Sequence, residues 1–307
     1  MTSFIGTHPM PNGASLALRE HQAAMRVQEA ASLAGHIQSS AVQRLIDLLG
    51  DEHPFVRWQA GVSLANSAAQ LRQRARSGSS IWSRQSPELT YSGLVALLRD
   101  GLQDSNALRR EATADMLGLL DHEVVVEHLV QSLEDEEASV RASAASALGR
   151  IADKSAADAL IPSLSDPSIW VRRAAADALG AIADPSSVSA LQLALADRHP
   201  LVRASAVCAL GHIHVARSRE IVEQCCSDPD ATVRWYAARA LVKIGSASSL
   251  SALEKVRRDD TVLFGQSTGE LADLAMEAIE HRESGPWHWL RKHWFALRRR
   301  LRRAHVR

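Results

Sequence analysis

The chain has 307 residues, and its 35 lysines and arginines balance its 35 aspartates and glutamates, so the formal net charge is zero. Aromatic residues make up only 4% while Ala and Leu are abundant, which favours packed helices over sheet. Three cysteines cannot form a disulfide framework, and no apolar run reaches the roughly 18 residues of a membrane span, so the composition excludes a disulfide-stapled or membrane-spanning protein and indicates a cytoplasmic one.

Residues 1–13 are predicted to be a flexible N-terminus, without the basic-then-apolar pattern of a signal peptide. From about residue 14 to residue 285 a repeated pattern follows. Four segments align without gaps from Asp135, Asp166, Asp197 and Asp228, and their arginines recur every 31 residues from Arg141 to Arg234. Looser copies surround Arg26-Val27, Val56-Arg57 and Leu108-Arg109, and a degenerate copy over Leu271–Ile279 closes the array.

Each repeat unit is predicted to be a pair of helices. Its apolar residues fall on one face of a 3.6-residue helix, and small residues at two fixed positions let neighbouring helices approach closely. A single pair cannot bury its apolar face, so the units are predicted to stack. We therefore expect an all-α, right-handed α-solenoid of seven to eight helix pairs over residues 14–285.

The repeated Asp and Arg have two interpretations. They could form a ladder that binds a ligand, or they could build the array, with the Asp capping a helix and the Arg bonding to turns or acids of the adjacent unit. We favour the second, because residues needed in every unit usually serve the array.

The step between the copies at Val56 and Leu108 is longer than the repeat. The excess falls at about residues 71–91, where a Ser-Gly-Ser-Ser stretch (77–80) is predicted to be a loop. This insertion either lies over a binding face or is a tolerated surface loop.

The pattern D-x4-V-R-x2-A-x2-A-L-G-x-I resembles the short HEAT-like repeats of the phycobilisome-lyase type, over roughly residues 14–285. The resemblance implies a HEAT-like fold and two functional classes, adaptors and bilin lyases that handle tetrapyrroles. A further relative, deoxyhypusine hydroxylase, builds a di-iron site from His-Glu pairs directly after Val-Arg. The matching pairs here include Trp58-Gln59 and Trp235-Tyr236 and none is His-Glu, so a di-iron hydroxylase is not expected.

The variable polar positions of the second helix of each pair are the candidates for recognition, because that helix normally lines the concave face. They form a ridge of mixed charge with aromatic residues near both ends, which is typical of a protein-binding surface. The alternative is that the aromatic residues fill gaps between units. The predicted partner-binding residues are Trp58, Arg110, Arg150, Arg173, Asp177, Cys208, His212, Trp235, Arg239 and Lys243.

Cys208 and His212 have the i,i+4 spacing that can place two ligands on one metal ion. Their surroundings do not match a known ligand set, since Cys226 takes an apolar position of the repeat. We therefore predict no metal, no cofactor and no catalytic residue.

The zero net charge combines two unlike parts. Residues 286–307 hold eight basic and no acidic residues, so residues 1–285 carry a net charge of −8 and repel duplex nucleic acid. The tail is predicted to be a basic amphipathic helix. It either binds an anionic membrane surface, binds an acidic protein, or caps the last unit of the array. Its candidate contact residues are Trp287, Trp289, Arg291, Lys292, Trp294, Arg298, Arg299, Arg300, Arg302 and Arg303. RNA or DNA contact through the tail and the basic insertion at about residues 71–91 stays open.

The predicted function is a non-catalytic adaptor or assembly factor that holds a protein partner on its concave face. Its tail would recruit it to the inner face of a membrane. The alternative is a bilin-lyase-like enzyme or chaperone that handles a tetrapyrrole or its acceptor protein, in which case a tetrapyrrole would be the cofactor.

Overall fold

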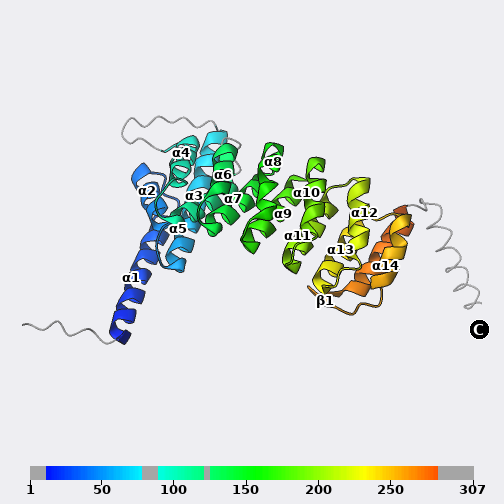
Figure 1. Ribbon diagram of the computed structural model, residues 1–307. Helices are drawn as coiled ribbons and strands as arrows, with labels where there is room; N and C mark the ends of the chain where they lie inside the picture. The colour runs from blue at the N-terminus through cyan, green and yellow to red at the C-terminus, as the bar shows by residue number, and fades with distance from the viewer. Residues whose placement is uncertain (1–11, 78–88, 121–124, 283–307) are drawn as a thin grey trace, which may run out of the picture. The chain divides into compact units, whose positions relative to one another are not determined.

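The computed structural model describes residues 12–77, 89–120 and 125–282 (Figure 1). Within these ranges almost all residues are helical, and two short strands form the described sheet. This confirms the predicted all-α repeat fold. The chain divides into two compact units, Met1–Ile151 and Ala152–Arg307.

The first unit begins with α1 (Asn12–Ser32). Three helix pairs follow it. The first is α2 (Ser39–Leu48) with α3 (Pro54–Ser77), and the second is α4 (Tyr91–Gly101) with α5 (Ala107–Leu120). The third is α6 (Val126–Gln131) with α7 (Ala138–Ile151), and the 3-10 turn η2 (Ser132–Glu134) extends α6. Residues 71–77 of the predicted insertion continue α3 as helix. The predicted loop at 77–80 lies almost wholly outside the described residues.

In the second unit η3 (Lys154–Ala156), α8 (Ala157–Leu160) and η4 (Pro162–Ser165) precede α9 (Ile169–Ile182). The next pairs are η5 (Pro185–Ser187) and α10 (Val188–Ala194) with α11 (Pro200–His212), and α12 (Ala216–Cys225) with α13 (Ala231–Ile244). The unit continues with η6 (Ala247–Ser249), α14 (Leu250–Val256), the strands β1 (Val262–Leu263) and β2 (Gln266–Ser267), and a helix over residues 268–282. Figure 1 shows α8, α10 and α12 in one row and α9, α11 and α13 in another. The described residues thus form α1 and seven helix pairs, within the predicted number.

A repeated arginine–aspartate pair joins each repeat of the array to the next repeat. In α9, Nε and Nη2 of Arg172 donate to both carboxylate oxygens of Asp197 (2.6 and 3.2 Å), and Nη1 donates to the backbone carbonyl of Asp166 (2.8 Å). The carboxylate of Asp197 also accepts from the backbone N–H of His199 (2.8 Å) and so fixes the turn before α11. The same ion pair recurs with the same 25-residue separation at Arg26–Asp51, Arg110–Asp135, Arg203–Asp228 and Arg234–Asp259.

We call these five pairs the arginine ladder. They confirm the interpretation of the repeated Asp and Arg as parts of the array. The capping role is different in detail, because Asp166 fixes the turn ahead of its helix, whereas the N-cap of α9 is Ser168.

The ladder corrects the alignment of one unit. The arginine that pairs with Asp135 is Arg110 and not Arg109, so the Leu108-Arg109 copy was placed one residue too early. Arg110 is only 8% exposed. Its predicted place on the partner-binding ridge is therefore wrong, because its guanidinium is buried in the joint between two units.

Small residues bring the second helices into close contact, as predicted. A Cβ atom added to Gly180 of α9 would lie 2.7 Å from the Cα of Ala209 of α11. Gly118 faces Ala147 and Gly211 faces Ala240 in the same way. Behind these contacts the core consists of fully buried leucines at repeated positions, among them Leu129, Leu160, Leu191, Leu148, Leu179 and Leu210.

We predict that Gly180→Ala lowers the free energy of unfolding. Overpacking against Ala209 costs about 1–3 kcal/mol, which outweighs the roughly 1 kcal/mol that Ala gains over Gly in a helix. The matched control is Gly61→Ala in α3, where the nearest atom to the new Cβ is the sulfur of Met116 at 3.8 Å. Urea denaturation should show Gly61→Ala at or above wild-type stability, and a stabilised Gly180→Ala protein would contradict the close packing.

We predict that Asp197→Ala destabilises the protein by about 3 kcal/mol, because it leaves the guanidinium of Arg172 buried without its partner. The two side chains are only 7% and 10% exposed. In the control, Asp100→Ala, the pair with Arg99 is 68% and 41% exposed, so its loss should cost less than about 0.5 kcal/mol.

The effect of Asp197 also depends on pH. Burial alone would raise the pKa of Asp197, but the hydrogen bonds from Arg172 and His199 outweigh it and lower that pKa. The pair therefore stabilises the fold above the ordinary pKa of about 4, and this contribution is lost as the pH falls through the lowered value. Equal stability of the wild type and Asp197→Ala at neutral pH would contradict the role of the ladder.

Candidate functional site

Seven of the predicted partner-binding residues lie on α9, α11 and α13 of the second unit. They occupy equivalent repeat positions on successive second helices, and their charges act on one another across all three helices, since Asp177 and Lys243 both influence His212. We call this surface the second-unit face. Its predicted residues are Arg173, Asp177, Cys208, His212, Trp235, Arg239 and Lys243.

An aromatic cluster stands at the α13 end of the second-unit face. Trp235 is 3% exposed and its indole N–H donates to the carbonyl of Gln266 (3.0 Å). Tyr236 packs edge-on against it (5.1 Å between ring centroids), Phe264 lies 5.4 Å away, and the guanidinium of Arg239 is 5.5 Å from the Trp235 ring centre. Trp235 thus fills space inside the unit, so its predicted place on the partner-binding ridge is wrong, and its neighbours form the accessible part of the cluster.

Phe264 is the most unusual member of this cluster. It is 81% exposed and has a φ angle of 52°, in the left-handed region that bulky residues rarely adopt. With Gly265 (φ 80°) it forms the two-residue turn between β1 and β2, where Leu263 pairs with Gln266. Both residues of such a turn need positive φ, which Asn-Gly supplies at lower cost than Phe-Gly. The hairpin therefore presents an apolar ring to solvent in spite of backbone strain.

Phe264 is not among the residues predicted from the sequence. A signal was present in the Val-Leu-Phe-Gly-Gln-Ser stretch over 262–267, which departs from the repeat and carries glycine in a tight-turn context. Strained conformations of this kind concentrate at functional sites.

The polar part of the second-unit face has shifted acid–base properties. Burial raises the pKa of Asp177, although Ser205, Arg173 and His212 oppose this. Burial and the positive charges of Lys243 and Arg239 lower the pKa of His212, which keeps its imidazole neutral near pH 7. The face therefore carries positive charge from its arginines and lysine beside one carboxylate, that of Asp177, which lies 3.6 Å from Nε of Arg173.

The cysteines have the properties of protonated thiols. Burial raises the pKa of Cys208 and outweighs the effect of Arg239, and it raises the pKa values of Cys225 and Cys226 to about 12. Because the thiolate is the nucleophilic form, these environments do not activate a cysteine. Among the residues that the structure describes, no group of three or more His, Cys, Asp or Glu side chains could hold a metal ion.

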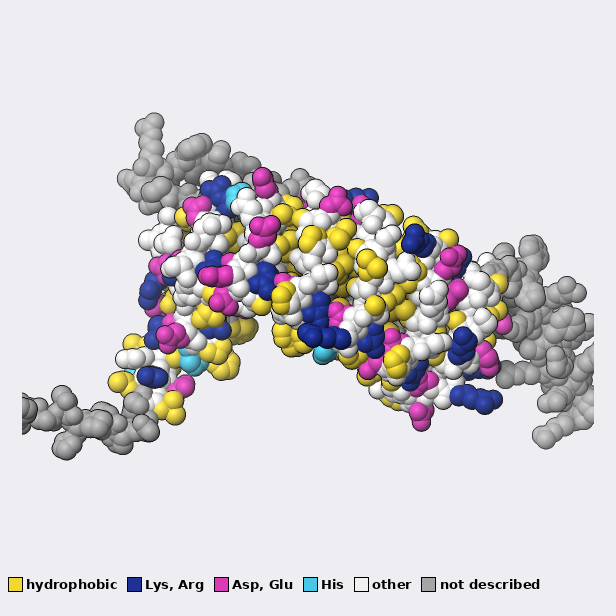
Figure 2. All heavy atoms as spheres, viewed as in Figure 1, with side chains coloured by type: hydrophobic (Ala, Val, Ile, Leu, Met, Phe, Trp, Pro, Cys, Tyr) yellow, Lys and Arg dark blue, Asp and Glu magenta, His cyan; other side chains and the backbone are white. Residues whose placement is uncertain are grey.

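The remaining predicted residues lie elsewhere. In the first unit Trp58 of α3 is 63% exposed, and Arg150 of α7 pairs with Asp115 of α5 (2.8 Å). The contact residues predicted from Trp287 to Arg303 lie outside the described residues. No helix in the described ranges is long and apolar enough to cross a membrane. Figure 2 shows acidic and basic side chains interspersed over the described part of the face in view.

Comparisons with known proteins show which proteins share this fold. A HEAT-repeat family model matches residues 126–197 and 188–267. The structure is similar to that of YibA from Escherichia coli, with a TM-score of 0.52 and 18% identity over 90% of this chain and 99% of that one. It is also similar to Kap95p in its complex with RanGDP, with a TM-score of 0.53 and 17% identity over 76% of this chain and 36% of that one.

A third similar structure is the CpcE–CpcF complex of phycocyanin lyase from Nostoc sp. PCC7120, with a TM-score of 0.45 and 21% identity over 77% of this chain and 86% of that one. No match was found among curated protein sequences. The repeat, the fold and the family model together define the chain as a HEAT-like repeat protein. Solenoids of this class commonly bind protein partners on extended surfaces.

Proposed function

We propose that this protein is a non-catalytic scaffold that holds a protein partner against the second-unit face. The observation that carries the proposal is the cluster of Tyr236, Arg239 and Phe264 around the buried Trp235. Tyrosine, tryptophan and arginine dominate protein-binding hot spots. A phenylalanine that is 81% exposed and held in a strained backbone conformation supports a role in binding.

Charge narrows the choice of partner. Arg173, Arg239 and Lys243 on this face outnumber its single predicted carboxylate, that of Asp177, which pairs with Arg173. A partner that supplies carboxylates beside an apolar group would complement both the cations and the aromatic cluster.

The basic residues 286–307 supply a second attachment in this proposal. Their eight positive charges and their tryptophans suit the headgroup layer of an anionic membrane. The segment would tether the scaffold and leave the second-unit face open to its partner.

We predict that Phe264→Asn separates stability from function. It removes the exposed ring and suits the turn better than Phe, so the free energy of unfolding should stay constant or rise by up to about 1 kcal/mol. Affinity purification with the full chain as bait should recover one stoichiometric partner, and Phe264→Asn and Arg239→Glu should each weaken its binding at least about tenfold.

The control for these variants is Arg217→Glu on α12, in the other row of helices, which should bind the partner like the wild type. Unchanged partner binding by Phe264→Asn and Arg239→Glu would contradict the proposed surface. Purified protein with a visible absorption band and no partner would favour the alternative function, the handling of a tetrapyrrole.

We predict that removal of residues 286–307 abolishes flotation with liposomes that contain anionic phospholipid. Neutral liposomes should bind neither form, because attraction between the tail and the headgroups drives the association. Equal flotation of the full-length and truncated chains would rule out the tail as the membrane anchor. Raised salt should weaken binding by the full-length chain.

A further inference from the structure

The close glycine–alanine stacking of second helices is absent between α3 and α5. At three other joints a glycine on one helix faces an alanine on the next, at Gly118–Ala147, Gly180–Ala209 and Gly211–Ala240. At the equivalent positions α3 carries Ala65 and α5 carries Met116. These larger side chains keep the two helices apart, and α3 packs far less closely on α5 than α5 does on α7.

The arginine ladder is interrupted at the same joint. Within the described residues, Arg57 donates only to the backbone carbonyls of Asp51 (2.8 Å) and Glu52 (3.0 Å). The carboxylate of Asp104, which stands where the ladder would place its partner, binds Arg109 instead (2.8 Å). Both the glycine–alanine contact and the arginine–aspartate pair are therefore missing between α3 and α5.

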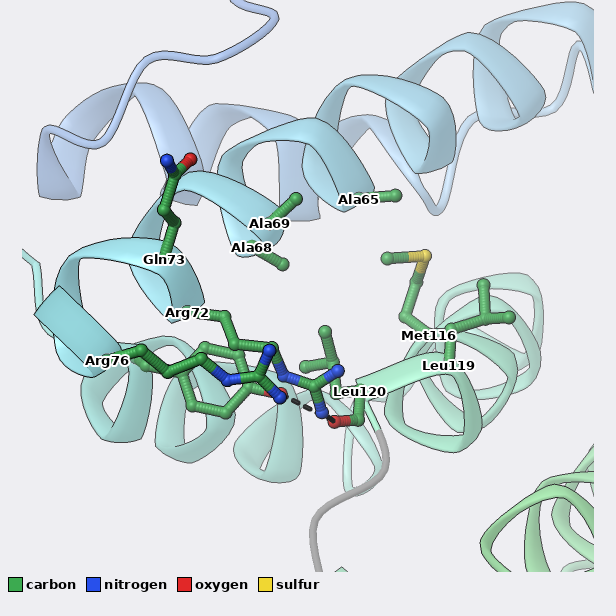
Figure 3. Close-up of a pocket in the computed structure, with 10 residues that line it drawn as sticks. Ala65, Ala68, Ala69, Arg72, Gln73, Arg76, Met116, Leu119 and Leu120 are labelled. Carbon is green, nitrogen blue, oxygen red and sulfur yellow. Dashed lines mark hydrogen bonds between the residues drawn. The ribbon is translucent and has the colours of Figure 1, made fainter.

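A pocket of about 300 Å³ occupies this opening (Figure 3). Ala65 and Ala68 point from α3 toward α5, and Met116 points back across the gap. Leu119 of α5, which is 57% exposed, completes the apolar wall. Because the walls consist of alanines and long flexible side chains, the pocket can admit a large apolar group.

One end of the pocket is positively charged. Figure 3 shows the guanidinium groups of Arg72 and Arg76 beside each other near the carbonyl of Leu120. Arg72 donates to that carbonyl and stacks over the Tyr91 ring at 5.5 Å. Arg76 is exposed and forms no ion pair or hydrogen bond within the described residues, and none of the described residues that line the pocket is acidic. Arg76 is thus available to a carboxylate.

The pocket continues along α3 as an exposed apolar stripe. Val62 (38% exposed) lies four residues after Trp58 (63% exposed) and three residues before Ala65, so the three side chains lie on one side of the helix. From Trp58 to Arg76 the helix rises about 27 Å, which matches about eight residues of extended peptide. The surface is apolar at the Trp58 end and cationic at the Arg76 end.

We propose that the groove between α3 and α5 binds a short peptide segment of a partner protein, in which large apolar side chains lie to one side of one or more carboxylates. The apolar side chains occupy the pocket between Ala65 and Met116, and a carboxylate pairs with Arg76. The basic tail of the chain itself does not suit the groove, because its arginines would meet Arg72 and Arg76. This site is separate from the second-unit face and does not depend on the function proposed for it.

The test uses the full-length chain and a phage-displayed library of random peptides. Enriched clones should combine apolar residues with Asp or Glu. Synthetic versions of these peptides should bind at least about tenfold more weakly to Ala65→Leu, which fills the pocket, and to Arg76→Glu, which reverses its charge.

Matched controls lie on the same helix. Ala75→Leu and Arg74→Glu change residues of α3 that do not line the pocket, and Arg239→Glu changes only the second-unit face, so all three should bind the peptides like the wild type. Thermal unfolding close to that of the wild type would show that each variant is folded.

Three outcomes would overturn the proposal. The library could yield no enriched clone, or its clones could bind Ala65→Leu and Arg76→Glu as tightly as the wild type. Enrichment only after residues 79–87 are replaced by Gly and Ser would mean that the chain's own insertion fills the groove.

Discussion

The structure depends on one interaction, the bidentate pair between an arginine of one unit and an aspartate of the next. Four of the five arginines also donate to a backbone carbonyl just ahead of their own helix, and each aspartate accepts from the backbone N–H two residues after it and so fixes the turn there. One charge pair thus sets the turn, the helix start and the spacing of neighbouring units. Burial makes the geometry strict, because an unpaired guanidinium in such a joint is costly. The regular stacking that follows places equivalent positions of successive second helices on a common surface, which is what makes the second-unit face possible.

Most of the fold could be predicted from the sequence because repetition adds up weak local signals. Periodic apolar positions identified the helix pairs, and the 31-residue step identified the arginine and aspartate of the four regular units. The prediction failed where the repeat is least regular. Arg109 and Arg110 are adjacent and both plausible, and the preceding Leu108 favoured the wrong one. The spacing of 31 residues between Arg110 and Arg141 indicates Arg110. The spacing from Arg57 to Arg110 includes the insertion, so it gives no second indication of the correct residue.

The candidate sites could be predicted only in part, for physical reasons that differ. Helical geometry alone places Asp177, Cys208 and Arg239 at equivalent positions of neighbouring helices, so the sequence identified the second-unit face. Phe264 was missed because its place beside Trp235 depends on a hairpin that does not belong to the repeat. The groove between α3 and α5 depends on Ala65 and Met116 together, two residues far apart in the sequence whose sizes matter only once the helices are stacked.

The absence of an arginine–aspartate pair at Arg57 also affects how the first unit unfolds. In an array whose units contact only their neighbours, stability is a sum of unit and joint energies, and the array opens first at its weakest joint. The α3–α5 joint lacks both the ladder pair and the glycine–alanine contact. Helices α1 to α3 therefore form a segment that can open while α5 and α7 stay packed together, and amide hydrogen exchange would show this as a boundary in protection between α3 and α5. A groove at such a boundary couples peptide binding to the local stability of the array.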